Sequence, residues 1–332
     1  MYQLLAIIIY MASMVFIGWY AFRRTTNLTD YMLGGRSLGP AVTALSAGAA
    51  DMSGWLLMGL PCAIYLNGLV EGWMAIGLTL GAYLNYVLVA PRLRVYTQVS
   101  NDSITIPSYL ENRLKDKTRI LRIASGIIIL IFFTFYVSSG MVAGGKFFLS
   151  SFGLDYHVGL LIVSAVVIFY TLFGGFLAVS YTDVVQGVIM FLALLLVPIV
   201  GLFFTGGLSE TATSIREVNP QLLNFFSGAS FLGILSTVAW GLGYFGQPHI
   251  IVRFMAISSV KELKSARRIG IGWMILSLFG AIATAFIGVA YYQQNKATLA
   301  DPETVFIVLG QIIFHPFIAG IMLAAVLAAV MS

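Results

Sequence analysis

Residues 41–55 read AVTALSAGAADMSGW, and residues 238–249 read VAWGLGYFGQPH. Both stretches lie inside long apolar segments, yet they are rich in small and polar residues. The second contains three glycines and a proline within twelve residues. In a helix interior glycine costs about 1 kcal/mol and proline about 3 kcal/mol relative to alanine. We therefore expect two apolar helices, each interrupted near its middle.

The surrounding segments are long enough to cross a membrane. Of the 332 residues, 59% are hydrophobic and 9% are charged, whereas an ordinary soluble domain has about 25% charged residues. Because roughly 20 apolar residues span a bilayer as a helix, this composition predicts an all-α membrane protein. The predicted spans are residues 2–21, 40–66, 70–90, 120–149, 158–178, 184–205, 228–252, 269–292 and a last one from about 316. Residues 303–314 are interpreted as a short re-entrant or external segment.

The basic residues predict the topology. Fifteen of the 18 lysines and arginines fall in the first loop, around the third loop and after the seventh span, and these regions share one side if the spans alternate. The positive-inside rule makes that side cytoplasmic and places the N-terminus outside. The formal charge of +5 is then explained without nucleic acid, and the sequence indicates no obligatory protein partner. We expect a multi-pass protein of the cell membrane, in contact with the lipid bilayer.

The two interrupted spans also predict the organisation of the chain. Four intact spans separate them, which fits a five-plus-five inverted repeat whose paired broken helices form a midplane site. Residues 1–332 would be a single transmembrane domain, with an extra N-terminal helix at 2–21, a first repeat at 40–205 and an incomplete second repeat at 228–332. We expect about two helices of the second repeat to be absent from this sequence.

Asp51 is the one acid placed well inside a predicted span. An ionisable group at that depth costs at least about 2.5 kcal/mol, so it usually indicates function. The carboxylate could attract a cation, take up and release a proton, or clamp neighbouring helix backbone. The sequence leaves these readings open.

Four aromatic residues lie in or beside the interrupted stretches: Trp55, Tyr136, Trp240 and Tyr244. Such rings can cover the hydrocarbon face of a compact zwitterion while a phenol or indole donates a hydrogen bond. Ordinary packing within a helix bundle is the alternative for each of them. The last span offers alanines that permit close helix approach and Ser332, whose hydroxyl is a hard oxygen ligand.

Other chemistry finds little support in the sequence. Asp183 stands near the start of the sixth predicted span, where capping of a helix N-terminus would explain an acid. The three histidines have no metal-ligand spacing, and the motifs of ATP-driven pumps and of hydrolases are missing. We expect neither an enzyme nor a bound cofactor.

Three stretches resemble the sodium:solute symporter family, and within it the sodium/proline symporters. They are DYMLGGRSLGP at 30–40, GAADMSGWLLMGLP at 48–61 and WGLGYFGQPH at 240–249, and the likeness extends through GGFLAVSYTD at 174–183 and LAAVMS at 327–332. The first is typical of the whole family, whereas the second and third are much narrower. The resemblance implies a leucine-transporter-like five-plus-five fold with one extra N-terminal helix.

The resemblance also implies roles for individual residues. Sodium would be held at Ala49 and Met52 of the first interrupted helix and at Ala329 and Ser332 of the last helix. Asp51 matches an acid important for sodium, and Asp183 matches an acid on the inner cation pathway. The positions at which the family handles proline, or closes over it, correspond to Ser53, Trp55, Tyr136, Trp240, Tyr244, Gln247 and Pro248.

We therefore expect sodium-coupled uptake of L-proline by alternating access. Transport of another small solute, or proton coupling through Asp51, are alternatives on the same fold. A solute sensor or channel that does not transport is a more remote alternative.

Overall fold

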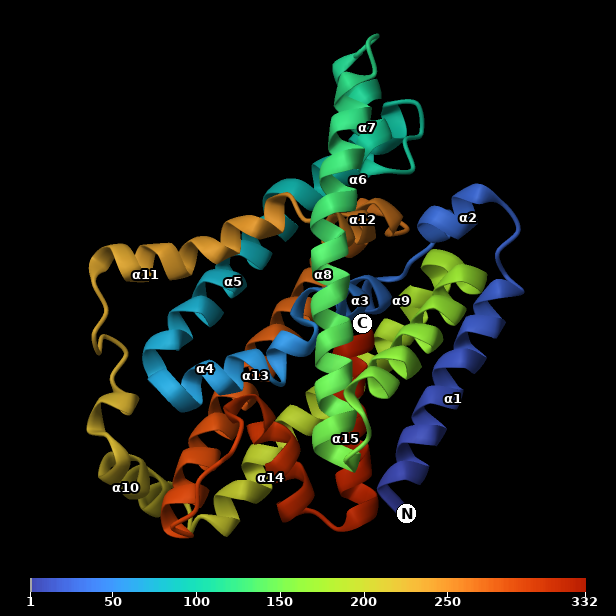
Figure 1. Cartoon of the computed structure of the whole chain (residues 1–332). Helices are drawn as coiled ribbons and strands as arrows, with labels where there is room; N and C mark the ends of the chain where they lie inside the picture. Colours follow the sequence, from blue (N-terminus) through green and yellow to red (C-terminus); the bar gives the residue numbers. More distant parts are fainter. Residues whose placement is uncertain (1) are drawn as a thin grey trace.

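The computed structural model describes residues 2–332, and in that part of the chain it contains helices and one isolated β-bridge but no strand. The α-helices are α1 (Tyr2–Phe22), α2 (Leu28–Leu33), α3 (Pro40–Met52), α4 (Gly59–Asn67), α5 (Gly72–Leu84), α6 (Ala90–Val99), α7 (Ile106–Leu114), α8 (Ile120–Phe152), α9 (Tyr156–Phe204), α10 (Leu208–Val218), α11 (Phe231–Val238), α12 (Pro248–Ala256), α13 (Leu263–Gln294), α14 (Val305–Ile313) and α15 (Pro316–Met331) (Figure 1). The shorter turns are η1 (Gly34–Arg36), η2 (Gly54–Leu56), η3 (Leu69–Glu71), η5 (Pro220–Leu223), η6 (Ala239–Phe245), η7 (Val260–Glu262) and η8 (Pro302–Thr304), and η4 (Asn85–Val89) is a π-helix.

The predicted membrane class is confirmed. Five helical segments of the described residues are long and apolar enough to cross a membrane, and a bent pair, 40–52 with 54–67, provides a sixth. The apolar side chains of α8 are largely uncovered, Phe135 being 72% exposed. A helix surface of this kind is stable against lipid or other apolar helices and costly in water. The segment 228–252 and the stretch from 316 form shorter helices.

One of these segments, α9, is two helices joined by a sharp turn. Its 49 residues would extend for about 73 Å as a straight helix, more than twice the hydrocarbon thickness. Gly175 breaks the run with φ 58° and ψ −150°, a conformation that essentially only glycine adopts without strain. The turn between the fifth and sixth spans therefore lies at Gly175, several residues before the predicted boundary between 178 and 184.

The first interrupted helix breaks at Ser53, as the small-residue stretch predicts. The axes of the helices on either side differ by 69°. Ser53 itself has φ 43° and ψ −159°, a region in which a residue with a β-carbon is strained by about 1–3 kcal/mol. Strain of this size persists only where the surroundings enforce it, which makes the break a candidate functional feature.

The second interrupted helix breaks between α11 and α12, where η6 replaces the α-helix and Pro248 starts the next one. Helix α5 supports this break at very close range. A β-carbon on Gly81 would lie 2.1 Å from the carbonyl oxygen of Gly241, and one on Gly77 would lie 2.4 Å from that of Val238. Only glycine permits this approach, so α5 and η6 pack backbone against backbone.

Basic residues from distant parts of the chain lie together at one end of the molecule. Figure 1 shows the N-terminus, α10 and α14 at one end and α2 and α7 at the other. At the second end Arg36 donates to the carbonyl of Met255 at 2.9 Å, and Arg94 donates to that of Ile257 at 2.6 Å. Basic segments that are distant in sequence therefore meet at one end.

Substituting Gly81 tests the contact between α5 and η6. Gly81→Ala should lower stability by about 1–3 kcal/mol, because its β-carbon forces two backbones apart. Thermal unfolding in detergent measures this effect. Gly126→Ala in α8 is the matched control, since a β-carbon there meets nothing within 4 Å. A Gly81→Ala protein as stable as the Gly126→Ala protein would show that the close contact is not needed.

Candidate functional site

The break at Ser53 exposes backbone oxygens to the interior of the bundle. The carbonyl oxygen of Ala49 accepts the backbone N–H of Ser53 at 3.1 Å and the hydroxyl of Ser332 at 2.9 Å. The same hydroxyl lies 3.1 Å from the carbonyl oxygen of Ala329. Oxygens of α3 and α15 thus come together around the side chain of Ser332.

Two further carbonyls belong to the same turn, those of Ala50 and Met52. Tyr136 of α8 donates its hydroxyl to the carbonyl of Ala50 at 2.6 Å. Met52 is the last residue of α3, and its carbonyl oxygen accepts no hydrogen bond from residues 2–332. The C-terminal end of a helix carries partial negative charge, and carbonyl and hydroxyl oxygens are ligands that hard cations prefer. This corner is therefore suited chemically to a small cation.

Asp51 connects the two interrupted helices. It lies in the last turn of α3, and Tyr244 of η6 donates a hydrogen bond from its hydroxyl to the Asp51 carboxylate. Tyr244 is itself buried. The two breaks, nearly 200 residues apart along the chain, are therefore joined by a hydrogen bond inside the bundle.

A cavity of about 140 Å³ adjoins the oxygens of the first break. It has the size of a few water molecules or part of a small solute. The helices α8, α9 and α15 form most of its wall. The lining residues are Ser53, Tyr136, Val137, Ser139, Gly140, Met141, Val163, Ser164, Val167, Ile168, Val330, Met331 and Ser332.

The remaining aromatic and polar candidates lie around the two breaks without converging on that cavity. The Trp55 ring in η2 packs over Gly59, where a β-carbon would lie 2.6 Å from Cδ1 of the ring. Gln247 folds back toward Gly243, and Pro248 begins α12. Trp240 is 58% exposed. The structure therefore brings Tyr136 and Tyr244 to the end of α3, whereas Trp240 is exposed and its side chain makes no hydrogen bond with the other candidates among residues 2–332.

Asp183 does not cap a helix, so the capping interpretation is wrong. Because the chain turns at Gly175, Asp183 lies well inside the second half of α9 and its side chain is 1% exposed. Its Oδ2 atom accepts Ser46 Oγ at 2.6 Å and Arg253 Nη2 at 2.9 Å, and Arg253 Nε donates to Ser46 Oγ at 2.9 Å. This triad ties α3, α9 and α12 together about one turn from Ala49.

Sequence reasoning missed Arg253 and Ser46 as partners of this acid. Arg253 is one of the basic residues that the charge pattern assigns to the cytoplasmic side after the seventh span, yet only a few residues separate it from the break before Pro248. A base that close to a mid-membrane break could have been read as the partner of an intramembrane acid.

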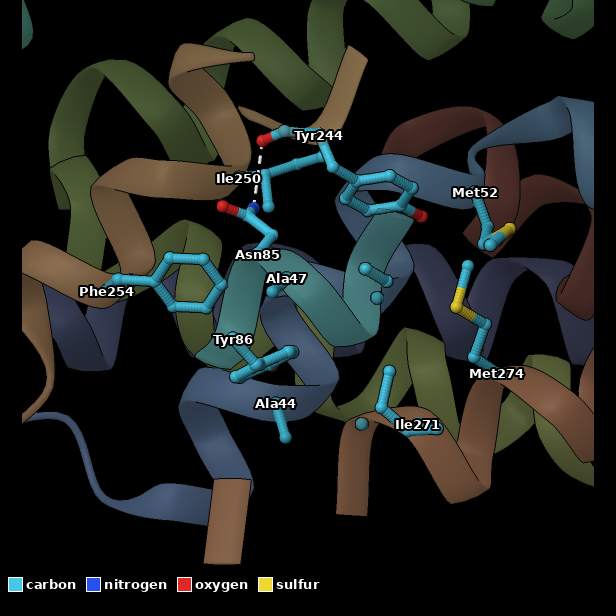
Figure 2. A pocket seen from close by; sticks show the side chains of 13 residues that line it. Ala44, Ala47, Met52, Asn85, Tyr86, Tyr244, Ile250, Phe254, Ile271 and Met274 are labelled. Carbon is cyan, nitrogen blue, oxygen red and sulfur yellow. Dashed lines mark hydrogen bonds between the residues drawn. The ribbon is translucent and has the colours of Figure 1, made fainter. Parts of the chain in front are cut away.

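A second small cavity lies beside the break in η6 and was also missed (Figure 2). Its volume of about 20 Å³ is enough for one water molecule. Asn85 of the π-helix donates Nδ2–H to the carbonyl of Tyr244 at 2.8 Å, as Figure 2 shows. The Oδ1 atom of Asn85 and the hydroxyl of Tyr86 are buried without a partner among the described residues. π-Helical turns often occur at functional sites, but a π-turn cannot be read from the sequence.

Comparison with known proteins identifies the family of the chain. The model of the sodium:solute symporter family matches residues 31–332. The chain belongs to the sodium:solute symporter family. It is a membrane protein of a family of transporters, as its resemblance predicted.

Curated relatives agree with this assignment. The chain is 66% identical over 319 residues to the high-affinity proline transporter PutP of Bacillus subtilis, which covers 96% of the chain and 67% of that protein. It is 57% identical to the osmoregulated proline transporter OpuE of the same organism, covering 98% of the chain and 66% of that protein. It is 56% identical to sodium/proline symporter 2 of Staphylococcus saprophyticus, and the match covers 98% of the chain and 64% of that protein. The chain thus spans about two thirds of the length of these relatives.

A solved structure shows the same fold. It is described as the substrate-bound outward-open state of a Na⁺-coupled sialic acid symporter. The TM-score is 0.88 at 20% sequence identity, and the match covers 100% of this chain and 71% of that one. The leucine-transporter-like helical fold expected from the sequence is therefore confirmed.

The buried triad predicts a non-additive effect on stability. Arg253→Met alone should cost about 3–5 kcal/mol, because it leaves the Asp183 carboxylate buried without its cation. Adding Asp183→Leu should recover most of that loss. Unfolding of both variants in detergent gives the comparison. Equal stability of the single and double variants would mean that Asp183 does not carry charge in this environment.

Proposed function

We propose that the full-length protein is a sodium-coupled symporter of L-proline that works by alternating access. The support is the combination of curated relatives named as proline transporters and sodium/proline symporters at 56–66% identity with the oxygen-rich break at Ser53. The observation that carries most weight is the meeting of Ala49, Ala329 and Ser332 oxygens at that break.

Sodium would bind at this corner. Its proposed ligands are the carbonyl oxygens of Ala49, Met52 and Ala329 together with the hydroxyl of Ser332. The Ala49 and Ala329 carbonyl oxygens each lie within hydrogen-bond distance of the Ser332 hydroxyl. The Met52 carbonyl accepts no hydrogen bond from residues 2–332 and could accept a cation. A bound ion would hold α3 against α15, so occupancy of the site would fix the geometry of the break.

Proline would bind next to the ion, between the two interrupted helices. The proposed contacts are Ser53, Trp55, Tyr136, Trp240, Tyr244, Gln247 and Pro248. Tyr136 and Tyr244 have hydroxyls at the break, and aromatic faces can stabilise a secondary ammonium by roughly 0.5–2 kcal/mol. Trp240, which is 58% exposed here, would have to turn inward when the pocket closes.

The two acids would serve the cation pathway. Asp51 would respond to both ligands, because it precedes Met52 in the last turn of α3 and its carboxylate accepts the Tyr244 hydroxyl. Asp183, paired with Arg253, would lie on the route by which sodium leaves. Linkage requires the coupling to be reciprocal, so proline must tighten sodium as much as sodium tightens proline.

The driving force is sufficient for strong accumulation. One sodium ion entering across about 100 mV supplies roughly 2.3 kcal/mol, and a tenfold concentration gradient adds about 1.4 kcal/mol. Together they support proline accumulation of several hundredfold.

Orientation and repeat boundaries belong to the same proposal. The end that contains α2 and α7 would face the cytoplasm and the N-terminus would lie outside, as the basic residues predict. The proposed repeats are residues 40–205 and 228–332, with α1 outside both.

Proline binding to the full-length protein in detergent tests this function. With potassium replacing sodium at constant ionic strength, sodium should raise proline affinity roughly 5- to 150-fold, the range typical of coupled sites. Asp51→Asn and Ser332→Ala should weaken that effect. Asp116→Asn is a control, because Asp116 lies in the loop after α7 and bonds only to local groups there.

The outcomes separate the alternatives. If the proline affinity does not depend on sodium but changes with pH, the coupling ion is a proton bound at Asp51 and not sodium. If a different solute binds in a competition panel, the proposed substrate is wrong, while the assignment of the fold is unaffected. Binding without counterflow of labelled proline would indicate a sensor.

A further inference from the structure

The extra N-terminal helix contributes polar groups to the interior of the bundle. Tyr10 of α1 accepts a hydrogen bond from Nε2 of Gln186 at 3.0 Å, and both residues are buried. Gln186 also approaches the sulfur of Met14 at 3.6 Å. Figure 1 shows α1 alongside α9 and α15, and the three helices are in mutual contact. A helix that served only to contact lipid would need no buried polar partner.

A second tyrosine links this interface to the first break. Tyr170, in the first half of α9, is 2% exposed, and its hydroxyl donates to the carbonyl oxygen of Met331 at 2.8 Å. That carbonyl and the N–H of Ser332 belong to the same planar peptide unit. A hydrogen bond to the oxygen therefore restricts rotation of the backbone that carries the Ser332 side chain.

Helix α1 packs closely against the backbone and β-carbon of Tyr170. A β-carbon on Gly18 of α1 would lie 2.6 Å from Cβ of Tyr170, and one on Gly174 would lie 2.8 Å from the carbonyl oxygen of Gly18. The α1 backbone thus lies directly against the start of the Tyr170 side chain. The backbone and β-carbon of Tyr170 therefore cannot shift toward α1, which fixes the base of the side chain that reaches Met331.

We propose that Tyr170 is a positioning residue for cation binding at Ser332, and that α1 acts on the ion site through it. This inference rests on the proposed sodium-coupled function. Tyr170 does not line the 140 Å³ cavity, and its hydroxyl bonds to Met331 and not to a proposed ion ligand. It fixes the peptide that precedes Ser332, and so keeps the hydroxyl of Ser332 facing the carbonyl oxygens of Ala49 and Ala329.

Removing the phenol oxygen of Tyr170 distinguishes a positioning role of this residue from a packing role. Phenylalanine at 170 keeps the ring and the contact of Cβ with Gly18, and it removes the hydroxyl that bonds to Met331. If the ring merely filled space, that substitution would leave ion binding unchanged. If the hydroxyl orients the Ser332 peptide, the ion site should weaken while the proline pocket keeps its own contacts.

The test is a sodium titration of proline uptake by the full-length protein in proteoliposomes. Tyr170→Phe should raise the sodium concentration for half-maximal uptake by roughly three- to tenfold, about the effect of one buried hydrogen bond. The KM for proline at saturating sodium should stay within about twofold of that of the unsubstituted protein. Tyr156→Phe, at the start of the same helix, is the matched control, because its hydroxyl makes no hydrogen bond with residues 2–332.

A second variant tests the role of α1. Gly18→Ala forces its methyl group against Tyr170 and should shift the sodium dependence in the same direction. It also serves as the test if Tyr170→Phe does not fold. An unchanged sodium dependence in the folded variants, with a lower maximal rate or less protein, would overturn the proposal. Uptake by the unsubstituted protein that ignores sodium would instead refute the proposed function on which it rests.

Discussion

The break that follows α3 at Ser53 is the constraint on which the structure depends. A peptide carbonyl that is buried without a hydrogen bond costs several kcal/mol in an apolar interior, so a helix that breaks there needs partners for the oxygens it releases. Tyr136 supplies one to Ala50, and Ser332 donates a second hydrogen bond to Ala49, whose carbonyl also accepts the N–H of Ser53. These partners come from α8 and α15, which explains why two helices far away in sequence converge on α3.

The buried charges follow the same logic. An ionised carboxylate in this environment needs a cation and further hydrogen bonds, and Asp183 obtains both from Arg253 and Ser46. Since Ser46 belongs to α3 and Arg253 to α12, the requirement of one acid fastens both interrupted helices to α9. Asp51 and Tyr244 make a second connection between the same two helices. Movement of either interrupted helix must therefore break or carry along a charged contact.

Much of this arrangement could be predicted from local sequence, because the signals are local. Small residues before Ser53 and the glycines and proline of 241–248 weaken helix directly, so both breaks were located correctly. The turn at Gly175 was misplaced, since a pair of glycines inside an apolar run does not reveal which residue takes positive φ. The partners Arg253 and Asn85 were missed for a different reason. Their roles depend on which helices become neighbours, and hydropathy does not specify that.

The backbone contact between α5 and η6 has a consequence for sequence change within the family. Gly77, Gly81 and Gly241 leave no space for a single added carbon at any of the three positions. A larger residue at 241 would first need a rearrangement of α5. Trp240 and Leu242 on either side of Gly241 are exposed, so substitutions there meet no such restriction. The close packing at the second break therefore restricts sequence change at these three glycines and leaves it to neighbouring positions.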